Sequence, residues 1–306
     1  MDLTNFEHAT GPVPKKISRR MWLKRSMGLA LGSTASVGLY ATLVEPHWVE
    51  VVHQPMDVPG LPAHLEGKTV VQISDIHIGG QVSDSFLIDW FQRINRWKPD
   101  YIVFTGDFLT LRADHSLPIE QMKKVLEHFP QGQLGTIGIL GNHDYGVRWK
   151  DLEAAEVVER IADNAGLPLL RNTVRTIDGL QFVGFEDFLS PCFGGANAMM
   201  KAVDLGQPTV VLCHNPDAAD RPIWADYQGW ILAGHTHGGQ CRVPFCDPPL
   251  LPLRNRRYSA GLFELKDGRR LYVNRALGYT HQVRFNVRPE VTVFHLTSQT
   301  REPVSA

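Results

Sequence analysis

The sequence carries almost no net charge. Its 31 lysine and arginine residues nearly balance 32 aspartate and glutamate residues, which leaves a formal net charge of -1 at pH 7. A protein that binds nucleic acid through its phosphates needs a basic footprint, so this balance argues against nucleic acid as a partner. Beyond its N-terminal region the chain also lacks an acidic tail and a polybasic run.

Cysteine is scarce as well. Four cysteines in 306 residues are too few for a disulfide-stapled scaffold. Cys241 and Cys246 are close enough in the sequence to pair, but their spacing is not that of a zinc knuckle. We interpret the four as free or buried thiols, since an unpaired cysteine behaves as a small hydrophobic residue.

A long, strongly apolar run is also missing. The uncharged stretch over 26–44 contains three glycines and five serine or threonine residues, which makes it a poor membrane-spanning helix. A basic run from Lys15 to Arg25 precedes it, and this is the order of an export signal. The alternative, a basic surface helix, explains the order less well.

The basic run contains Ser18-Arg19-Arg20-Met21-Trp22-Leu23-Lys24, which resembles the twin-arginine consensus. No clean A-x-A cleavage site precedes Glu45, so the segment can also persist as a membrane anchor. We expect three regions: a twin-arginine signal or anchor over 1–45, a linker over 46–66 and a folded domain over 67–306.

The rest of the chain is long enough to bury a sizeable core. From Lys68 onwards, short apolar runs alternate with helical patterns, which predicts an α/β fold. The first half predicts strands over 69–73, 101–104 and 137–140, and helices over about 84–98, 119–129 and 151–165. The second half predicts strands over 209–212, 230–232 and 291–294, and a hairpin turn at Asp267-Gly268.

Five short polar clusters directly follow predicted strands. They are Asp75-Ile76-His77, Gly106-Asp107, Gly141-Asn142-His143-Asp144, Cys213-His214-Asn215 and Gly234-His235-Thr236-His237. Because the C-terminal ends of strands in an α/β sheet open on one edge, distant segments meet there. Divalent transition metals accept carboxylate, imidazole and amide ligands. One such cluster is usually a helix cap, but the ordered set predicts a metal site.

The motifs D-x-H, G-D, G-N-H-D, H and G-H-T-H, in this order, resemble the calcineurin-like metallophosphoesterase family. Within it, His214-Asn215-Pro216-Asp217 and the G-H-T-H-G-G-Q run are similar to the twin-arginine-signal-bearing bacterial phosphodiesterase branch, of the YaeI and YkuE type. The resemblance implies an α/β fold, a four-layer αββα sandwich of two mixed β-sheets flanked by helices.

The same resemblance implies roles for individual residues. The first metal ion would be held by Asp75, His77, Asp107 and His237, and the second by Asp107, Asn142, His214 and His235. Asp107 is the expected bridge, because two cations about 3.5–4 Å apart need an anion between them, and they activate a hydroxide nucleophile. His143 is expected to stabilise the transition state or protonate the leaving alkoxide, with Asp144 orienting its ring.

These residues predict metal-dependent hydrolysis of phosphate esters, by a phosphodiesterase or a pyrophosphatase. A second interpretation is hydrolysis of UDP-2,3-diacylglucosamine at a membrane surface. An interaction scaffold and a nuclease are disfavoured, the first because every expected ligand is present and the second because the chain is neutral. Of the remaining histidines, we expect His115 to lie nearest the substrate.

The types of ligand do not distinguish among Mn, Fe, Zn and Co as the bound metal. The twin-arginine route exports folded proteins, so the chain can load its metals in the cytoplasm, and this favours Mn²⁺. We expect a periplasmic protein, or one anchored to the outer face of the inner membrane. The predicted partners are the twin-arginine export machinery and either a phosphate-ester small molecule or a lipid-linked substrate.

Overall fold

The computed structural model describes residues 18–110 and 116–298, and the chain divides into two compact units, Met1–Tyr40 and Ala41–Ala306. The first unit contains α1 (Arg19–Leu39), which begins at the capping residue Ser18. The part of the basic run before residue 18 lies outside the described residues.

The helical segment Arg19–His47 corrects one expectation. It has 29 residues, and an 18-residue stretch within it has a mean hydropathy of 1.4, so by length and composition it can cross a membrane. The glycines suggested a poorer span, but the leucine, alanine and valine residues between them raise the average. Signal sequences meet the same criterion, so the segment suits either a signal or an anchor.

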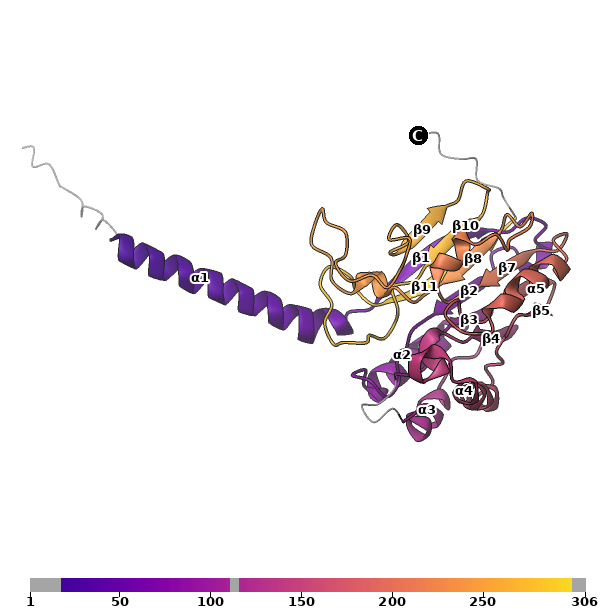
Figure 1. Cartoon of the computed structure of the whole chain (residues 1–306), viewed down its shortest axis with the longest axis horizontal. Helices are drawn as coiled ribbons and strands as arrows, with labels where there is room; N and C mark the ends of the chain where they lie inside the picture. The colour runs from indigo at the N-terminus through magenta and orange to yellow at the C-terminus, as the bar shows by residue number, and fades with distance from the viewer. Residues whose placement is uncertain (1–17, 111–115, 299–306) are drawn as a thin grey trace, which may run out of the picture. The chain divides into compact units, whose positions relative to one another are not determined.

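The second unit contains two mixed β-sheets (Figure 1). The first has the strand order β1-β11-β2-β3-β4. All neighbours in it are parallel except β11 and β2. Its strands are β1 (Glu50–Asp57), β2 (Thr69–Ile73), β3 (Tyr101–Thr105), β4 (Gly135–Ile139) and β11 (Glu290–Thr297).

The second sheet has the order β5-β6-β7-β8-β10-β9. Its inner pairs are parallel, and both edge strands, β5 and β9, run antiparallel to their neighbours. Its strands are β5 (Thr173–Ile177), β6 (Leu180–Gly184), β7 (Thr209–Leu212), β8 (Trp230–Ala233), β9 (Gly261–Glu264) and β10 (Arg270–Val273). The predicted hairpin at Asp267-Gly268 joins β9 to β10.

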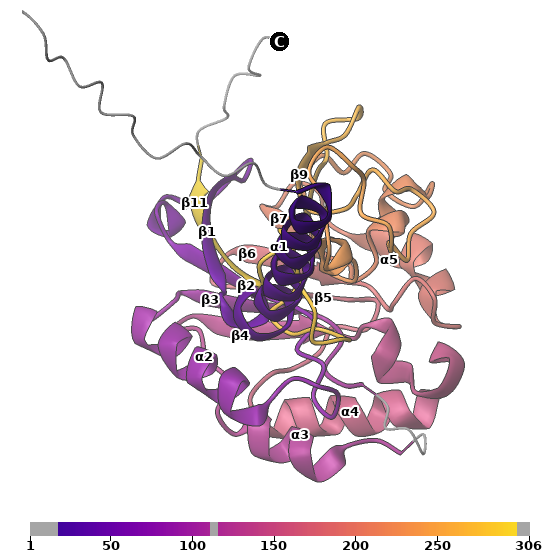
Figure 2. The ribbon, with the colours of Figure 1, turned by 90° about the vertical axis from the view of Figure 1, so that its left-hand side faces the viewer.

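Helices cover the outer face of each sheet (Figure 2). Against the first sheet lie α2 (Asp84–Trp97), α3 (Ile119–Leu126) and α4 (Leu152–Asn164), and against the second lies α5 (Ala196–Ala202). A separate apolar core fills the space between the sheets, where Val103 and Phe182 pack from opposite sides. The predicted αββα sandwich is confirmed.

Local sequence explains why the helices begin where they do. Ser83 caps α2 by accepting the N–H of Phe86 (3.2 Å), and Asp151 caps α4 by accepting that of Ala154 (3.0 Å). Apolar residues spaced three and four apart then face the sheet. In α2 the buried ones are Leu87, Phe91 and Ile94.

The structure corrects the predicted linker over 46–66. These residues contain β1, which pairs with β11 along its full length. This strand lies at the sheet edge, where most of its side chains stay partly exposed. It therefore lacks the buried apolar run that marks the inner strands, and Pro55 is tolerated only because an edge strand can leave one N–H position unpaired. The edge strand β5 was missed for the same reason, since its side chains are mostly exposed.

One charged contact joins β2 to the residue before β3. The Asp100 carboxylate accepts the backbone N–H of Thr69 (2.8 Å) and lies 3.0 Å from Lys68 Nζ. Burial opposes ionisation of Asp100, but these hydrogen bonds outweigh it and lower its pKa. Because the folded pKa lies below the unfolded one, the stabilisation is present above the unfolded pKa and is lost as pH falls through the folded pKa.

Asp100→Ala should therefore lower the free energy of unfolding at pH 7 by about 1–2 kcal/mol, the usual contribution of charged hydrogen bonds. The difference from the native chain should shrink as the pH falls below about 4. Urea unfolding at both pH values measures it, with the exposed Glu120→Ala as a control. An effect of Asp100→Ala that is the same at both pH values would contradict this account.

Candidate metal centre

All five polar clusters lie at the C-terminal ends of strands, after β2, β3, β4, β7 and β8. Two groups of three side chains result. Asp75, His77 and His237 form the first, and Asp107, His214 and His235 form the second. Within each group the potential ligand atoms lie within 4.8 Å of one another, and all six residues are buried.

Asp107 lies between the two groups. Its Oδ2 is 3.2 Å from Nε2 of His214, in its own group, and 3.7 Å from Nε2 of His77, in the other. Its Oδ1 accepts the backbone N–H of His143 (2.9 Å), which fixes the carboxylate plane. A carboxylate in this position can contact ions in both groups.

Several buried polar atoms at the centre form no hydrogen bond with the described residues. They include Asn142 Oδ1, His237 Nδ1 and His214 Nε2, although the last has the 3.2 Å contact with Asp107 given above. An unsatisfied buried polar atom is costly and needs an explanation. Amide oxygen and imidazole nitrogen are both donors to divalent metals, so a pair of cations fits this donor set.

Contacts behind the imidazoles orient them. Nδ1 of His77 lies 2.9 Å from Thr110 Oγ1, and Nδ1 of His214 lies 2.7 Å from the Thr105 carbonyl oxygen. Nε2 of His235 lies 3.2 Å from the Pro252 carbonyl oxygen. Such partners hold the ring and leave the other nitrogen for a metal. The sequence could not identify these partners, because two of them are backbone carbonyls and carry no side-chain signal.

Three of the candidate ligands, Asp75, His77 and His235, have the protonation states that metal binding requires. Burial opposes the charge of Asp75, but His237 and His214 outweigh it and lower its pKa to about 2. Burial and the nearby His237 lower the pKa of His77 to about 3, and burial with the nearby His214 lowers that of His235 to about 4. Both rings are therefore neutral at pH 7, as metal binding requires.

The backbone is strained at this centre. Asp75, His77, Asp107, His235 and His237 all have φ between 49° and 72°, in the left-handed region. A residue with a side chain costs roughly 1–3 kcal/mol there, and such residues concentrate at functional sites. Five of the seven predicted ligands share this conformation, which turns their side chains inward immediately after each strand.

Glycines let the loops approach one another. Gly106 has φ of 95°, and a Cβ there would lie 2.7 Å from Nδ1 of His214. A Cβ on Gly234 would lie 2.3 Å from Oδ2 of Asp75. Neither position can hold a larger residue without moving a ligand.

The sequence profile of the calcineurin-like phosphoesterases matches residues 68–239. The chain belongs to the calcineurin-like phosphoesterase family. It is therefore a metallophosphoesterase, a hydrolase that acts on phosphoric ester bonds, of a family that uses a binuclear divalent metal centre.

Curated relatives extend over nearly the whole phosphoesterase. The chain is 33% identical to the metallophosphoesterase YkuE of Bacillus subtilis, with 93% of this chain and 99% of YkuE aligned. It is 31% identical to the phosphodiesterase YaeI of Escherichia coli (92% and 99%). It is 30% identical to the UDP-2,3-diacylglucosamine pyrophosphatase LpxG of Chlamydia trachomatis (87% and 94%).

His143 lies beside the two groups of this phosphoesterase and belongs to neither. It is partly exposed, and its ring centroid is 5.1 Å from that of His77 with the planes at 87°. A partly exposed imidazole next to buried ligands can reach a substrate. The other candidate near the substrate, His115, lies outside the described residues.

The structure corrects the expected contact between Asp144 and the His143 ring. The Asp144 carboxylate is buried and accepts the backbone N–H groups of Asp107, Phe108, Leu109 and Gly141 at 2.8–3.2 Å. It forms no hydrogen bond with the His143 ring. Asp144 instead joins the loop after β3 to the loop after β4, and so holds Asp107 in place.

Asp144→Asn should therefore act through Asp107. Its amide N–H₂ would face backbone donors, which costs about 1–3 kcal/mol of folding stability. Metal affinity should fall about 10–100-fold, as for other residues that support ligands. Calorimetric metal titration measures this. A variant that keeps full metal affinity and loses only the catalytic step would instead support a role through His143.

The sequence also missed Asp187, which follows β6 at the same sheet edge. It is fully buried, and its Oδ2 has no hydrogen-bond partner among the described residues. Burial raises the pKa of Asp187 to about 6, although the charge on His214 opposes the shift. It escaped notice because β6 was not predicted, so no strand end marked this position.

The four cysteines of the phosphoesterase are free thiols, as interpreted from the sequence. Cys213 lies next to His214 and is buried. Burial raises its pKa well above the usual range of a thiol, so it stays protonated and packs as a small apolar residue. Cys246 is exposed, and no disulfide joins it to Cys241.

Proposed function

We propose that this phosphoesterase hydrolyses phosphodiester or pyrophosphate bonds at two divalent metal ions. The observation that carries the proposal is the position of Asp107 between two buried ligand groups. Asp75, His77 and His237 would hold one ion and His214, His235 and Asn142 the other, with Asp107 shared.

When bound, the two ions supply Lewis acidity to the phosphoryl oxygens and lower the pKa of water. The chain's own residues would position the substrate and the metal ions and protonate the leaving group. His143 would donate a proton to the leaving oxygen, because its partly exposed ring lies beside the buried ligand groups. The Asn142 side chain, one residue before it, would hold the second ion through its buried oxygen.

The proposed metal is Mn²⁺, because mixed oxygen and nitrogen ligands accept it and a folded protein exported by the twin-arginine route can be loaded in the cytoplasm. The segment over 1–45 is proposed to direct that export. Metal analysis of the chain isolated from the periplasm tests both points. Zinc as the main ion would overturn the first, and a cytoplasmic protein the second.

The assay that tests the activity is a panel with Mn²⁺: bis(4-nitrophenyl) phosphate, 4-nitrophenyl phosphate and a UDP-linked pyrophosphate. Turnover of the diester or the pyrophosphate, lost on chelation, is expected. Relatives named as a phosphodiesterase and as a pyrophosphatase support this choice of substrates. No turnover of any of the three with Mn, Fe, Zn or Co would refute the proposal.

A second candidate is a lipid-linked pyrophosphate substrate at a membrane surface. It is favoured by the loop 243–250, whose apolar side chains Val243, Phe245 and Leu250 are exposed. The loop packs against the turn that follows the candidate ligand His237, because a Cβ on Gly239 would lie 2.3 Å from Pro248. Two arginines beside the loop suit anionic headgroups: Arg242 adjoins it in the sequence, and the Arg256 guanidinium donates to the Pro248 carbonyl oxygen.

The start of the second unit supports retention of the N-terminal segment. Ala41 and Glu45 are buried. The Ala41 carbonyl accepts the N–H of Arg284 (2.8 Å), and the Glu45 carboxylate accepts that of Val287 (2.6 Å). Cleavage near residue 45 would remove these contacts, so we propose that the segment stays attached as an anchor.

Vesicle binding tests the membrane candidate. Phe245→Ser with Leu250→Ser should weaken adsorption to anionic vesicles and lower turnover of a diacylated UDP-sugar. Hydrolysis of bis(4-nitrophenyl) phosphate should stay the same. Replacement of the exposed Leu205, far from this loop in the sequence, is the matched control. Unchanged adsorption and lipid turnover in the double variant would refute this candidate.

A further inference from the structure

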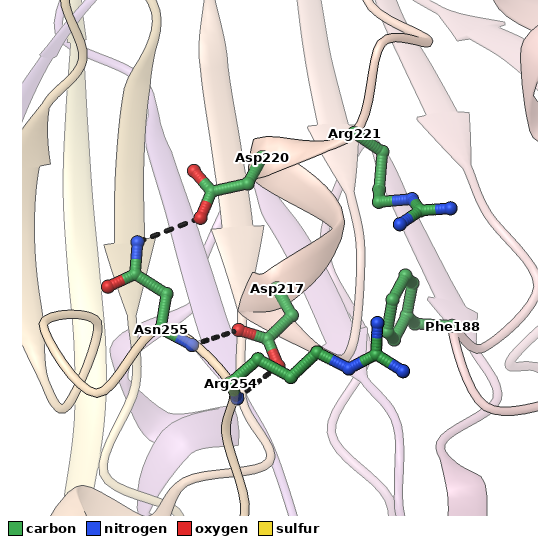
Figure 3. Close-up of a pocket in the computed structure, with 6 residues that line it drawn as sticks. All are labelled: Phe188, Asp217, Asp220, Arg221, Arg254 and Asn255. Carbon is green, nitrogen blue, oxygen red and sulfur yellow. Dashed lines mark hydrogen bonds between the residues drawn. The ribbon is translucent and has the colours of Figure 1, made fainter.

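A pocket separate from the metal ligands lies at the end of the short helix η7 (Pro216–Asp220) (Figure 3). Its volume is about 380 Å³. Two aspartates, two arginines, an asparagine and a phenylalanine line it: Asp217, Asp220, Arg221, Arg254, Asn255 and Phe188. The catalytic proposal above uses none of these residues.

Two residues of the pocket lie close in the sequence to residues that interact with the second ligand group. Phe188 directly follows Asp187, whose charge acts on His214. Arg254 lies two residues after Pro252, whose carbonyl oxygen is 3.2 Å from Nε2 of His235. Phe188 and Arg254, on two sides of the pocket, thus belong to segments that also contain residues near the metal centre.

The two acidic side chains of the pocket are already satisfied. Asp217 accepts the backbone N–H groups of Arg254 (2.7 Å) and Asn255 (2.9 Å). Asp220 accepts from the Asn255 side chain (2.8 Å) and from the Tyr258 hydroxyl (2.7 Å). Each carboxylate therefore shapes the pocket wall rather than pairing with an arginine.

The guanidinium groups of the two arginines can bind an anion, because neither is neutralised by a protein carboxylate. In the ranges 18–110 and 116–298, neither Arg221 nor Arg254 forms an ion pair, and neither guanidinium donates a hydrogen bond to the protein. The Arg221 guanidinium lies 5.7 Å from the centre of the Phe188 ring. In Figure 3 the guanidinium ends of both arginines lie on the side of the pocket where Phe188 lies.

Phe188 offers an aromatic face beside this charge. It is partly exposed, and its ring is held by an edge contact with Phe193, with centroids 5.1 Å apart. Guanidinium groups bind phosphate through paired N–H donors, which a point charge cannot do. An aromatic ring beside them can stack on a planar group such as a nucleobase.

We propose that this pocket binds a second phosphate of the substrate, together with the planar group attached to it. Arg221 and Arg254 would hold the phosphate, and Phe188 would pack on the planar group. The preferred substrate is then a nucleoside pyrophosphate diester rather than a diester with a single phosphate. This inference rests on the proposed function, because it adds a subsite to that metal centre.

Calorimetric binding to the full chain, stripped of metal with EDTA, tests the subsite without catalysis. The probes are UDP and inorganic pyrophosphate. Arg221→Gln and Arg254→Gln should each weaken UDP and pyrophosphate by about tenfold or more, the effect of losing a charged hydrogen bond. Phe188→Leu should weaken only UDP, because pyrophosphate has no ring. The nearby exposed Arg257→Gln is the matched control and should bind both normally.

Kinetics of the metal-loaded chain give the second readout. Both arginine variants should raise KM for UDP-N-acetylglucosamine about tenfold or more and leave kcat/KM for bis(4-nitrophenyl) phosphate unchanged. UDP that fails to bind the metal-free chain, or equal losses on both substrates, would overturn the subsite. If no ester is hydrolysed at all, the proposed function fails while the calorimetric result still decides the subsite.

Discussion

Asp107→Asn should abolish metal binding and phosphate-ester hydrolysis together. The substitution keeps the size of the side chain and removes the negative charge between the two ligand groups. Without that charge, the repulsion between two bound cations would no longer be offset. Loss of several kcal/mol of charge stabilisation corresponds to a fall in rate of about 10³-fold or more. Metal content by elemental analysis and turnover of bis(4-nitrophenyl) phosphate measure the two effects.

The matched control is the exposed Asp226→Asn, which should keep both metals and full activity. Asp107 also accepts the backbone N–H of His143 (2.9 Å), and an asparagine oxygen can keep that contact. The loss therefore reports on charge rather than on the loop. Retention of two metals per chain by Asp107→Asn would show that the carboxylate is not their bridge.

His143→Ala should lower the rate of hydrolysis without loss of metal, unlike Asp107→Asn. The chain should keep both metals, because neither ligand group includes His143. The rate should fall by about 10²–10⁴-fold, the usual contribution of a general acid. The fall should be larger for an alkoxide leaving group than for 4-nitrophenoxide, which leaves without a proton.

His128→Ala, an exposed histidine at the end of α3, is the control and should change nothing. Comparing the rates for two leaving groups separates proton donation from simple disturbance of the site. A His143→Ala chain that has lost its metals, or that loses the same factor with both leaving groups, would argue against its role as the acid.

Both variants address residues that the sequence identified because of where they occur. Asp107 and His143 each come shortly after a short apolar strand. This pattern can be recognised in the sequence without any knowledge of the fold. Most inner strands were predictable for the same reason, since burial on both faces demands an apolar run, although β6 was missed. The edge strands β1 and β5 were not, because their half-exposed residues follow no such rule.

The hydrogen-bond partners of Asp144 could not be predicted from the sequence for a different reason. Its partners are four backbone amides, and backbone groups are the same in every residue. Adjacency to His143 suggested a contact, but within η4 (Asn142–Tyr145) the Asp144 carboxylate accepts backbone N–H groups instead. Only the folded structure shows which groups the carboxylate contacts.

The amino-acid sequence alone determined the kinds of ligand, their order and the strand ends that carry them. The tertiary structure decided which candidate ligands share a group, that Asp107 lies between the groups, and that five of these residues adopt left-handed backbone. It also brought Arg221 and Arg254 to one pocket. The physical reason is that periodicity encodes which face of a strand is buried, whereas distances between loops depend on how two sheets pack.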